Sequence, residues 1–183
     1  MKNNVIRNVA ALITLVIVFS SCAKEVDLSP TRPVPGNGGQ EPTVTIIENK
    51  INKDSLLLLV NETRAKGCNC GGTQMPAVGA IAWNELLEFA AVSHSKDMSD
   101  NSYFSHNSRN GDTPGKRLDA VGYRWNAYAE NIAKGPKNAA EVIAGWIKSP
   151  EHCKNLMNGS MKEMGVGRYN EYWTQAFGVI NTK

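Results

Sequence analysis

The stretch that decides the fold is residues 163–180, EMGVGRYNEYWTQAFGVI. Two runs within it, 163–169 and 172–180, are rich in the aromatic and β-branched residues that strands favour. Asn170-Glu171 separates the runs, and this arrangement predicts a β-hairpin. We expect a third strand within residues 123–133.

Helical patterns occupy the chain before and between these strands. The first predicted helix ends at Gly67, and the second carries an apolar stripe from Leu87 to Met98 that includes His94. The predicted helices begin at Asp54 or Ser55, Asn84, Thr113, Asn138 and Ser149. Helices come first, strands cluster late, and the connections are short. The predicted class is therefore α+β, with helices packed on a small antiparallel sheet.

The N-terminus has the pattern of an export signal. Lys2 and Arg7 precede residues 9–19, an apolar run too short to cross a membrane. Ser20-Ser21-Cys22 follows and resembles a relaxed bacterial lipobox, so we expect residues 1–22 to be a signal peptide and Cys22 to carry the lipid that anchors the protein in a membrane. The alternative is ordinary cleavage near Ser21, which leaves Cys22 as a plain thiol. The expected location is the outer membrane or cell surface, otherwise the periplasm or the medium.

The remaining chain divides by composition. Residues 23–50 are rich in proline and glycine and poor in large apolar side chains, so they are interpreted as a flexible linker. Residues 51–183 have the length of one domain. Loss of Lys2 and Arg7 with the signal lowers the formal net charge from +3 to +1, which argues against a nucleic-acid partner.

Four polar residues of this domain lie in loops or near helix starts, where binding and catalytic residues are often found. His106 lies in a polar loop, and Glu130 interrupts an apolar stretch and must be paired if it is buried. Glu141 occupies the third position of a capping box, a sufficient structural reason for its presence. His152 lies in the first turn of a helix, where the dipole disfavours a positive charge and keeps the ring neutral, as a metal ligand must be.

The same four residues fall within motifs that resemble those of the CAP family, which includes cysteine-rich secretory proteins, antigen 5 and plant PR-1, and here a bacterial lipoprotein-type member. The resemblance covers nearly everything after Ile51. It implies a three-layer α-β-α sandwich in which the four side chains converge in a cleft, which in some members binds a divalent metal. The motifs are Phe104-Ser105-His106, Gly122-Tyr123-Arg124-Trp125, Glu130-Asn131-Ile132-Ala133, Glu141-Val142 with Trp146, Ser149-Pro150-Glu151-His152 and Glu163-Met164-Gly165-Val166-Gly167.

Two imidazoles and two carboxylates suit zinc, with His106 and His152 as ligands and Glu130 and Glu141 orienting the rings or a bound water. The alternative is that the four side chains satisfy one another without a metal. Glu151 and Ala129 stand where the family usually has glycine. Glu151 adds a carboxylate that strengthens cation binding, raises the pKa of its histidine neighbour or faces solvent.

Export to an oxidising compartment favours a disulfide among Cys68, Cys70 and Cys153, with one cysteine left over. The resemblance to bacterial relatives implies the pair Cys70–Cys153, with Cys68 free. A rival interpretation makes Cys153 a catalytic thiol beside a histidine.

Three classes of function remain open. The first is a surface binding module that captures a lipid, a peptide or a glycan. The second is a metal-assisted peptidase or esterase, in which Glu130 or Glu141 polarises a zinc-bound water. The chain has neither a His-Glu-x-x-His nor a Gly-x-Ser-x-Gly sequence, which argues against the common hydrolases. The third is a structural protein of the cell envelope or an adhesion protein.

Overall fold

The computed structural model describes residues 47–181, so the expected signal peptide, Cys22 and most of the expected linker lie outside the described residues. The helices are α1 (Lys53–Lys66), α2 (Glu85–Asp100), α3 (Pro114–Ala120), α4 (Ala139–Lys148) and α5 (Pro150–Leu156). The strands are β1 (Cys68–Cys70), β2 (Thr73–Met75), β3 (Ala82–Trp83), β4 (Trp125–Lys134), β5 (Glu163–Tyr169) and β6 (Tyr172–Ile180). Within this range, no helix has the length and hydropathy that a membrane crossing requires.

The predicted hairpin is confirmed as β5 and β6, which pair antiparallel up to Tyr169 opposite Tyr172, and Asn170 adopts a positive φ in the turn. β4 is the expected third strand and pairs antiparallel with β6. The sheet order is β3-β5-β6-β4. β3 was not predicted, because two residues are too few to show a periodic pattern. It pairs parallel with β5.

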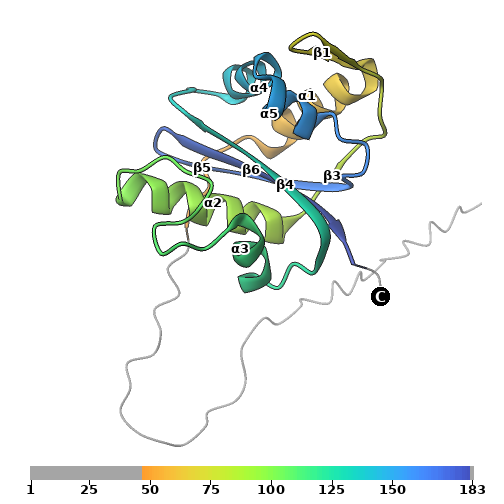
Figure 1. Cartoon of the computed structure of the whole chain (residues 1–183). Helices are drawn as coiled ribbons and strands as arrows, with labels where there is room; N and C mark the ends of the chain where they lie inside the picture. The colour runs from red at the N-terminus through yellow and green to blue at the C-terminus, as the bar shows by residue number, and fades with distance from the viewer. Residues whose placement is uncertain (1–46, 182–183) are drawn as a thin grey trace, which may run out of the picture. The chain divides into compact units, whose positions relative to one another are not determined.

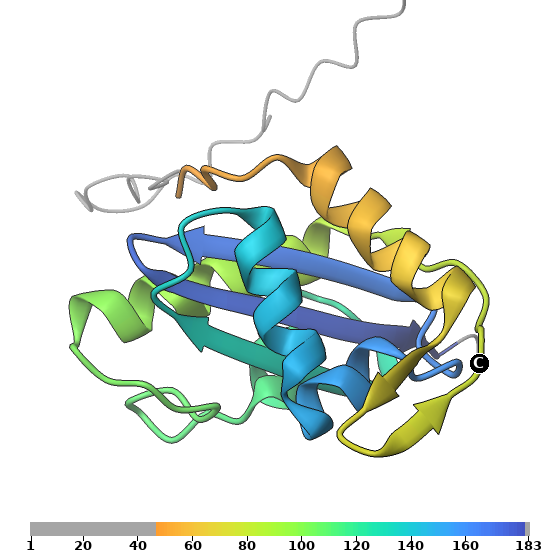
Figure 2. The ribbon, with the colours of Figure 1, turned by 90° about the horizontal axis from the view of Figure 1, so that it is seen from above.

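The sheet lies between two helical layers (Figures 1 and 2), and the predicted α+β sandwich is confirmed. α2 and α3 cover one face, while α1, α4 and α5 cover the other. The β1–β2 hairpin extends from the layer of α1, α4 and α5.

The face under α2 is made by small residues. A Cβ on Gly165 or Gly167 would lie 2.0 Å from a backbone nitrogen of α2, so the helix backbone rests almost directly on β5. The predicted apolar stripe of α2 is confirmed as the buried side of the helix. Its buried members are Leu87, Ala90, Ala91, His94 and Met98.

The opposite face is covered by large side chains. Trp146 of α4 and Trp173 and Phe177 of β6 are almost completely buried there. Alternate residues of β5 point into this core, because successive strand side chains leave opposite faces. The core includes Leu56, Val60, Val142, Ile143, Leu156, Met164 and Val166.

The start of α1 differs from the sequence-based expectation. Asn52, rather than Asp54 or Ser55, caps the helix, because its side-chain oxygen accepts a hydrogen bond from the Ser55 amide at 2.8 Å. Near the other end, Arg64 is 1% exposed and donates to the carbonyls of Leu156, Asn158, Met161 and Gly79. α1 is thereby fixed to the loop between α5 and β5.

Candidate functional site

Glu130 lies at the centre of the candidate site. Its side chain is only 6% exposed, and both carboxylate oxygens are occupied. Oε1 accepts from His106 Nδ1 at 2.8 Å, and Oε2 accepts from Arg117 Nη2 at 2.6 Å. Charge-assisted hydrogen bonds of this kind compensate the cost of burying a carboxylate.

Arg117 was not identified from the sequence, although it organises this part of the molecule. Besides Glu130, it donates to the carbonyl of His106 at 2.9 Å and to Ser108 Oγ at 3.1 Å. One side chain of α3 therefore fixes both the carboxylate on β4 and the loop that carries His106. A single arginine in a short helix has no sequence pattern that would mark it.

The His106 ring is half exposed and has one nitrogen hydrogen-bonded to Glu130. Its side chain is 50% exposed, and the Nδ1 of a neutral ring must carry the proton that Glu130 accepts. Nε2 then holds the lone pair. A carboxylate that orients an imidazole in this way is the usual support for a metal-binding histidine.

His152 comes from the opposite helical layer, on α5. Burial lowers the pKa of its ring, the nearby His106 lowers it further, and Glu151 raises it in part. The ring is therefore neutral near pH 7. Lys154 donates to Glu151 at 2.7 Å, and Glu151 is 80% exposed, so this carboxylate faces solvent and also raises the pKa of its histidine neighbour.

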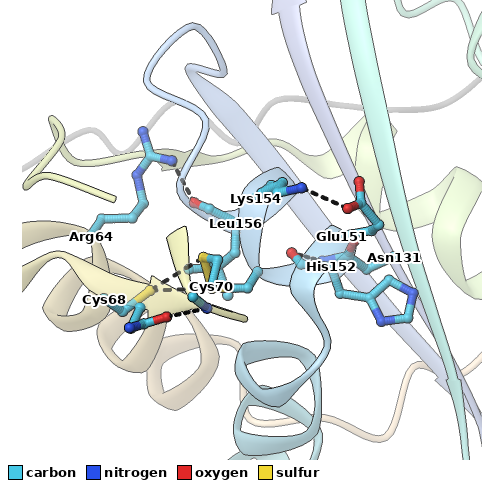
Figure 3. The surroundings of a disulfide bond; sticks show 11 residues. Arg64, Cys68, Cys70, Asn131, Glu151, His152, Lys154 and Leu156 are labelled. Carbon is cyan, nitrogen blue, oxygen red and sulfur yellow. Dashed lines mark hydrogen bonds and ion pairs between the residues drawn. A yellow bond between two sulfur atoms is a disulfide. The ribbon is translucent and has the colours of Figure 1, made fainter. Parts of the chain in front are cut away.

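β4 joins the two layers at the edge of the sheet. Asn131, which follows Glu130 and is fully buried, donates to the carbonyl of His152 at 3.1 Å (Figure 3). Asn155 of α5 donates to Asn131 Oδ1 at 2.9 Å and to the carbonyl of Glu130 at 3.2 Å. Successive residues of one strand thus hold the His106 loop on one face and the His152 helix on the other.

Glu141 is engaged in its own helix cap. Its carboxylate accepts from the Lys137 amide at 2.9 Å and from Asn138 Nδ2 at 2.8 Å, while its amide donates to Asn138 Oδ1 at 3.0 Å. The predicted capping box is present in this form. Among the described residues, Glu141 makes no hydrogen bond to His106, Glu130 or His152.

By donor type, the two imidazoles suit a divalent ion such as zinc. Burial favours the neutral form of His152, and Glu130 orients the ring of His106. Each carboxylate oxygen of Glu130 and Glu141 already accepts one hydrogen bond. In residues 47–181, the one group of three His, Cys, Asp or Glu ligand atoms within 4.8 Å consists of Cys68, Cys70 and Cys153.

The three cysteines of the described residues lie together where β1 contacts α5. Cys70 and Cys153 form a disulfide with a Cα–Cα distance of 5.4 Å, and Cys68 is free. This is the pair that the resemblance implies. A catalytic role for Cys153 does not fit a sulfur that is bonded and 0% exposed.

His94 is packed within the α2 layer. It is 1% exposed, and its Nε2 lies 2.9 Å from the carbonyl of Ser105, the residue before His106. Nδ1 has no partner among the described residues. Burial lowers the pKa of the ring, and Arg117 lowers it further.

A second concave region lies between α1 and the start of α4. It has a volume of about 530 Å³, and its apolar floor is bordered by three cationic side chains. Leu58, at 59% exposed, forms part of the floor. Its apolar lining includes Ile51, Leu58 and Leu59, and the cationic side chains are Lys50, Lys137 and Arg168.

Comparison with protein families gives a match between residues 57–180 and the model described as CAP, the cysteine-rich secretory protein family. The uncharacterized protein YkwD of Bacillus subtilis is 36% identical over 96 residues, which cover 51% of this chain and 37% of YkwD. The uncharacterized membrane protein YlbC of the same organism is 33% identical over 97 residues, 53% of this chain and 28% of YlbC. The chain thus spans about a third of the length of these relatives.

Two solved structures are also similar. An extracellular protein of Bacillus anthracis that contains an SCP domain superposes with a TM-score of 0.62 at 33% identity, covering 68% of this chain and 39% of that one. An outer surface protein of Borrelia burgdorferi gives a TM-score of 0.61 at 20% identity, covering 74% of this chain and all of that one. The second likeness concerns the fold alone.

Proposed function

Because the chain belongs to the CAP family of cysteine-rich secretory proteins, we propose that it is an extracytoplasmic binding module. Residues 1–22 direct export, Cys22 carries the lipid anchor, and residues 23–50 tether a domain formed by residues 51–183. The face that presents His106 and His152 binds the ligand, with a divalent metal, zinc, held between the two imidazoles.

The observation that carries this proposal is the engagement of Glu130. A general base needs a carboxylate oxygen that can take a proton from water. Both oxygens of Glu130 are bound, one of them by an arginine at 2.6 Å, and both oxygens of Glu141 are used in the helix cap. The arrangement therefore favours capture of a ligand over hydrolysis of one.

The location is supported by a similar protein. The B. anthracis protein, which is 33% identical to this chain over the matched residues, is an extracellular protein. An export signal followed by a tether agrees with display at a surface.

The first test is calorimetric titration of zinc into residues 23–183 after treatment with a chelator. We expect a dissociation constant of about 1 μM or tighter. His106→Ala and His152→Ala should each weaken binding at least about tenfold, because each removes one of two protein ligands. Glu141→Gln is the matched control and should bind as the wild type does. Absence of binding in the wild type, or wild-type affinity in either histidine variant, contradicts the metal site.

Turnover separates binding from hydrolysis. Zinc-loaded protein should release no product from peptide or ester substrates above the rate of Glu130→Gln. A rate that Glu130→Gln abolishes while the fold persists would instead favour the metal-assisted hydrolase.

A second candidate function is capture of an anionic amphiphile in the groove between α1 and α4. The specific observation is an apolar floor bordered by Lys50, Lys137 and Arg168, which suits an acyl chain with a negative headgroup. A fluorescent fatty acid should bind the wild type, and Leu58→Asp should weaken binding about tenfold or more by adding a negative charge beside the ligand. Leu86→Asp, at an exposed leucine of α2, is the control. Equal affinity in both variants would exclude this groove.

A further inference from the structure

Three cysteine sulfurs gather where β1 meets α5. Cys68 Sγ lies 3.3 Å from Cys153 Sγ and 3.7 Å from Cys70 Sγ, the two sulfurs of the disulfide (Figure 3). Cys68 and Cys70 share one face of β1, because they are two residues apart in a strand. A free thiol is therefore held in contact with a disulfide.

The packing of the turn after β1 explains why the sulfurs stay together. A Cβ on Gly71 would lie 2.4 Å from Pro150 Cγ, so this turn is pressed against the first residue of α5. Gly71 also has a φ of 63°, which a residue with a side chain rarely adopts. This packing and the Cys70–Cys153 disulfide hold the strand that carries two of the cysteines against the helix that carries the third.

We propose that Cys68 is an internal exchange thiol for the Cys70–Cys153 disulfide. Cys68 Sγ lies beside the disulfide, nearly equidistant from its two sulfurs, so its side chain first rotates into line with the Cys70–Cys153 bond. The Cys68 thiolate then attacks Cys153 Sγ, a Cys68–Cys153 bond forms, and the Cys70–Cys153 bond breaks. Cys70 leaves with the electron pair of the broken bond and takes up a proton equivalent to the one that Cys68 lost. The step needs no external oxidant or reductant.

Cys153 is the sulfur attacked, for two reasons. It is the nearer of the two, at 3.3 Å against 3.7 Å. Attack on Cys70 would instead join two residues of one strand whose Cα atoms are roughly 6.6 Å apart, near the upper limit for a disulfide. Exchange at Cys153 keeps α5 joined to β1 in both isomers.

The two isomers differ in where the free thiol lies. In the structure, the free thiol is Cys68, which is partly exposed. After exchange it is Cys70, which is 0% exposed. The isomer therefore determines whether an external thiol reagent can reach a sulfur at this site. Burial raises the pKa of Cys68, so the exchange is slow near neutral pH and faster in mild alkali.

The experiment uses the full exported chain carrying Cys22→Ser, so that Cys68, Cys70 and Cys153 are the remaining cysteines. In this background, Cys70→Ser should form the Cys68–Cys153 bridge, found by peptide mapping of unreduced protein, and should have no free thiol. Cys68→Ser is the matched control and should keep Cys70–Cys153. A folded Cys70→Ser variant with two free thiols would overturn the proposal.

A second measurement keeps the test decisive if Cys70→Ser does not fold. The three-cysteine protein is held at about pH 9, where thiolates form, then quenched in acid, unfolded and alkylated. Tandem mass spectrometry should find the label on Cys70 as well as Cys68, and the exchange rate should rise about tenfold per pH unit below the thiol pKa. Label confined to Cys68 after long incubation would overturn the proposal.

Discussion

The two faces of the central sheet are built by opposite means. On the face under α2, Gly165 and Gly167 leave out their side chains so that helix and strand backbones meet. On the other face, Trp146, Trp173 and Phe177 fill the space between the sheet and α1, α4 and α5. The comparison teaches that one face depends on the absence of side chains and the other on their volume. Added side-chain volume should therefore destabilise the first face, and removed volume should destabilise the second.

The largest effect is expected on the α2 face. Gly167→Ala places a methyl group 2.0 Å from the amide nitrogen of Val92, and a helix backbone cannot yield as a flexible side chain can. We expect a loss of at least about 3 kcal/mol in the free energy of unfolding, measured by urea denaturation.

The matched control is Gly145→Ala in α4. A Cβ there meets nothing within 4 Å, and alanine favours a helix over glycine. The same substitution should therefore stabilise the protein by about 0.5–1 kcal/mol. A Gly167→Ala variant within about 1 kcal/mol of the wild type would show that α2 can move away from the sheet.

The second prediction tests the face that depends on volume. Met164 precedes Gly165 but points into the opposite core, where it is 0% exposed. Met164→Ala should cost about 3 kcal/mol by leaving a cavity, while Met164→Leu should cost less than about 1.5 kcal/mol. If both substitutions cost the same, packing volume does not govern this face.

Much of this fold is predictable because its signals are local. The hairpin of β5 and β6 follows from two apolar runs around Asn170-Glu171, and the caps at Asn84 and Asn138 follow from their side chains. β3 was missed because two residues carry no period, and its pairing with β5 joins segments about eighty residues apart in sequence. The sequence shows the glycines of β5, but it does not show which helix packs against them.

Some residues of the candidate site were also predictable from the sequence, and others were not. His106 and Glu130 are brought into contact as the resemblance implied, and their 2.8 Å hydrogen bond joins residues of a loop and a strand. Arg117 and Asn131, which hold these elements, give no local signal because their role depends on which elements pack together. Glu141 is the reverse case, since its capping role was readable from sequence and is present in the structure.

The third prediction concerns pH and the α2 face. Burial keeps His94 neutral in the folded state, so its folded pKa lies below the usual value of about 6.5. Below about pH 6.5 the unfolded chain takes up a proton that the folded state excludes. The free energy of unfolding should therefore be at its full value above this pH and fall as the pH decreases, with a slope of at most about 1.4 kcal/mol per pH unit from this residue.

Urea denaturation between about pH 7 and pH 5 measures this slope. His94→Gln removes the titrating ring and retains a donor for the Ser105 carbonyl, so its stability should depend less on pH than that of the wild type. His152, whose pKa is also lowered by burial, leaves a residual slope in this variant. Equal slopes for both proteins would mean that His94 is not held neutral.

The smallest effect is expected at the solvent-exposed start of α4, above the face that depends on volume. Glu141→Ala removes the carboxylate that accepts from the Lys137 amide and Asn138. It should lower the free energy of unfolding by about 0.5–1 kcal/mol, because water can replace part of the hydrogen bonding that the cap loses. Zinc affinity should remain unchanged, since the cap occupies both carboxylate oxygens. A loss of zinc binding with unchanged stability would show instead that Glu141 leaves the cap to support the two histidines, and would return the carboxylate to the site that the resemblance implied.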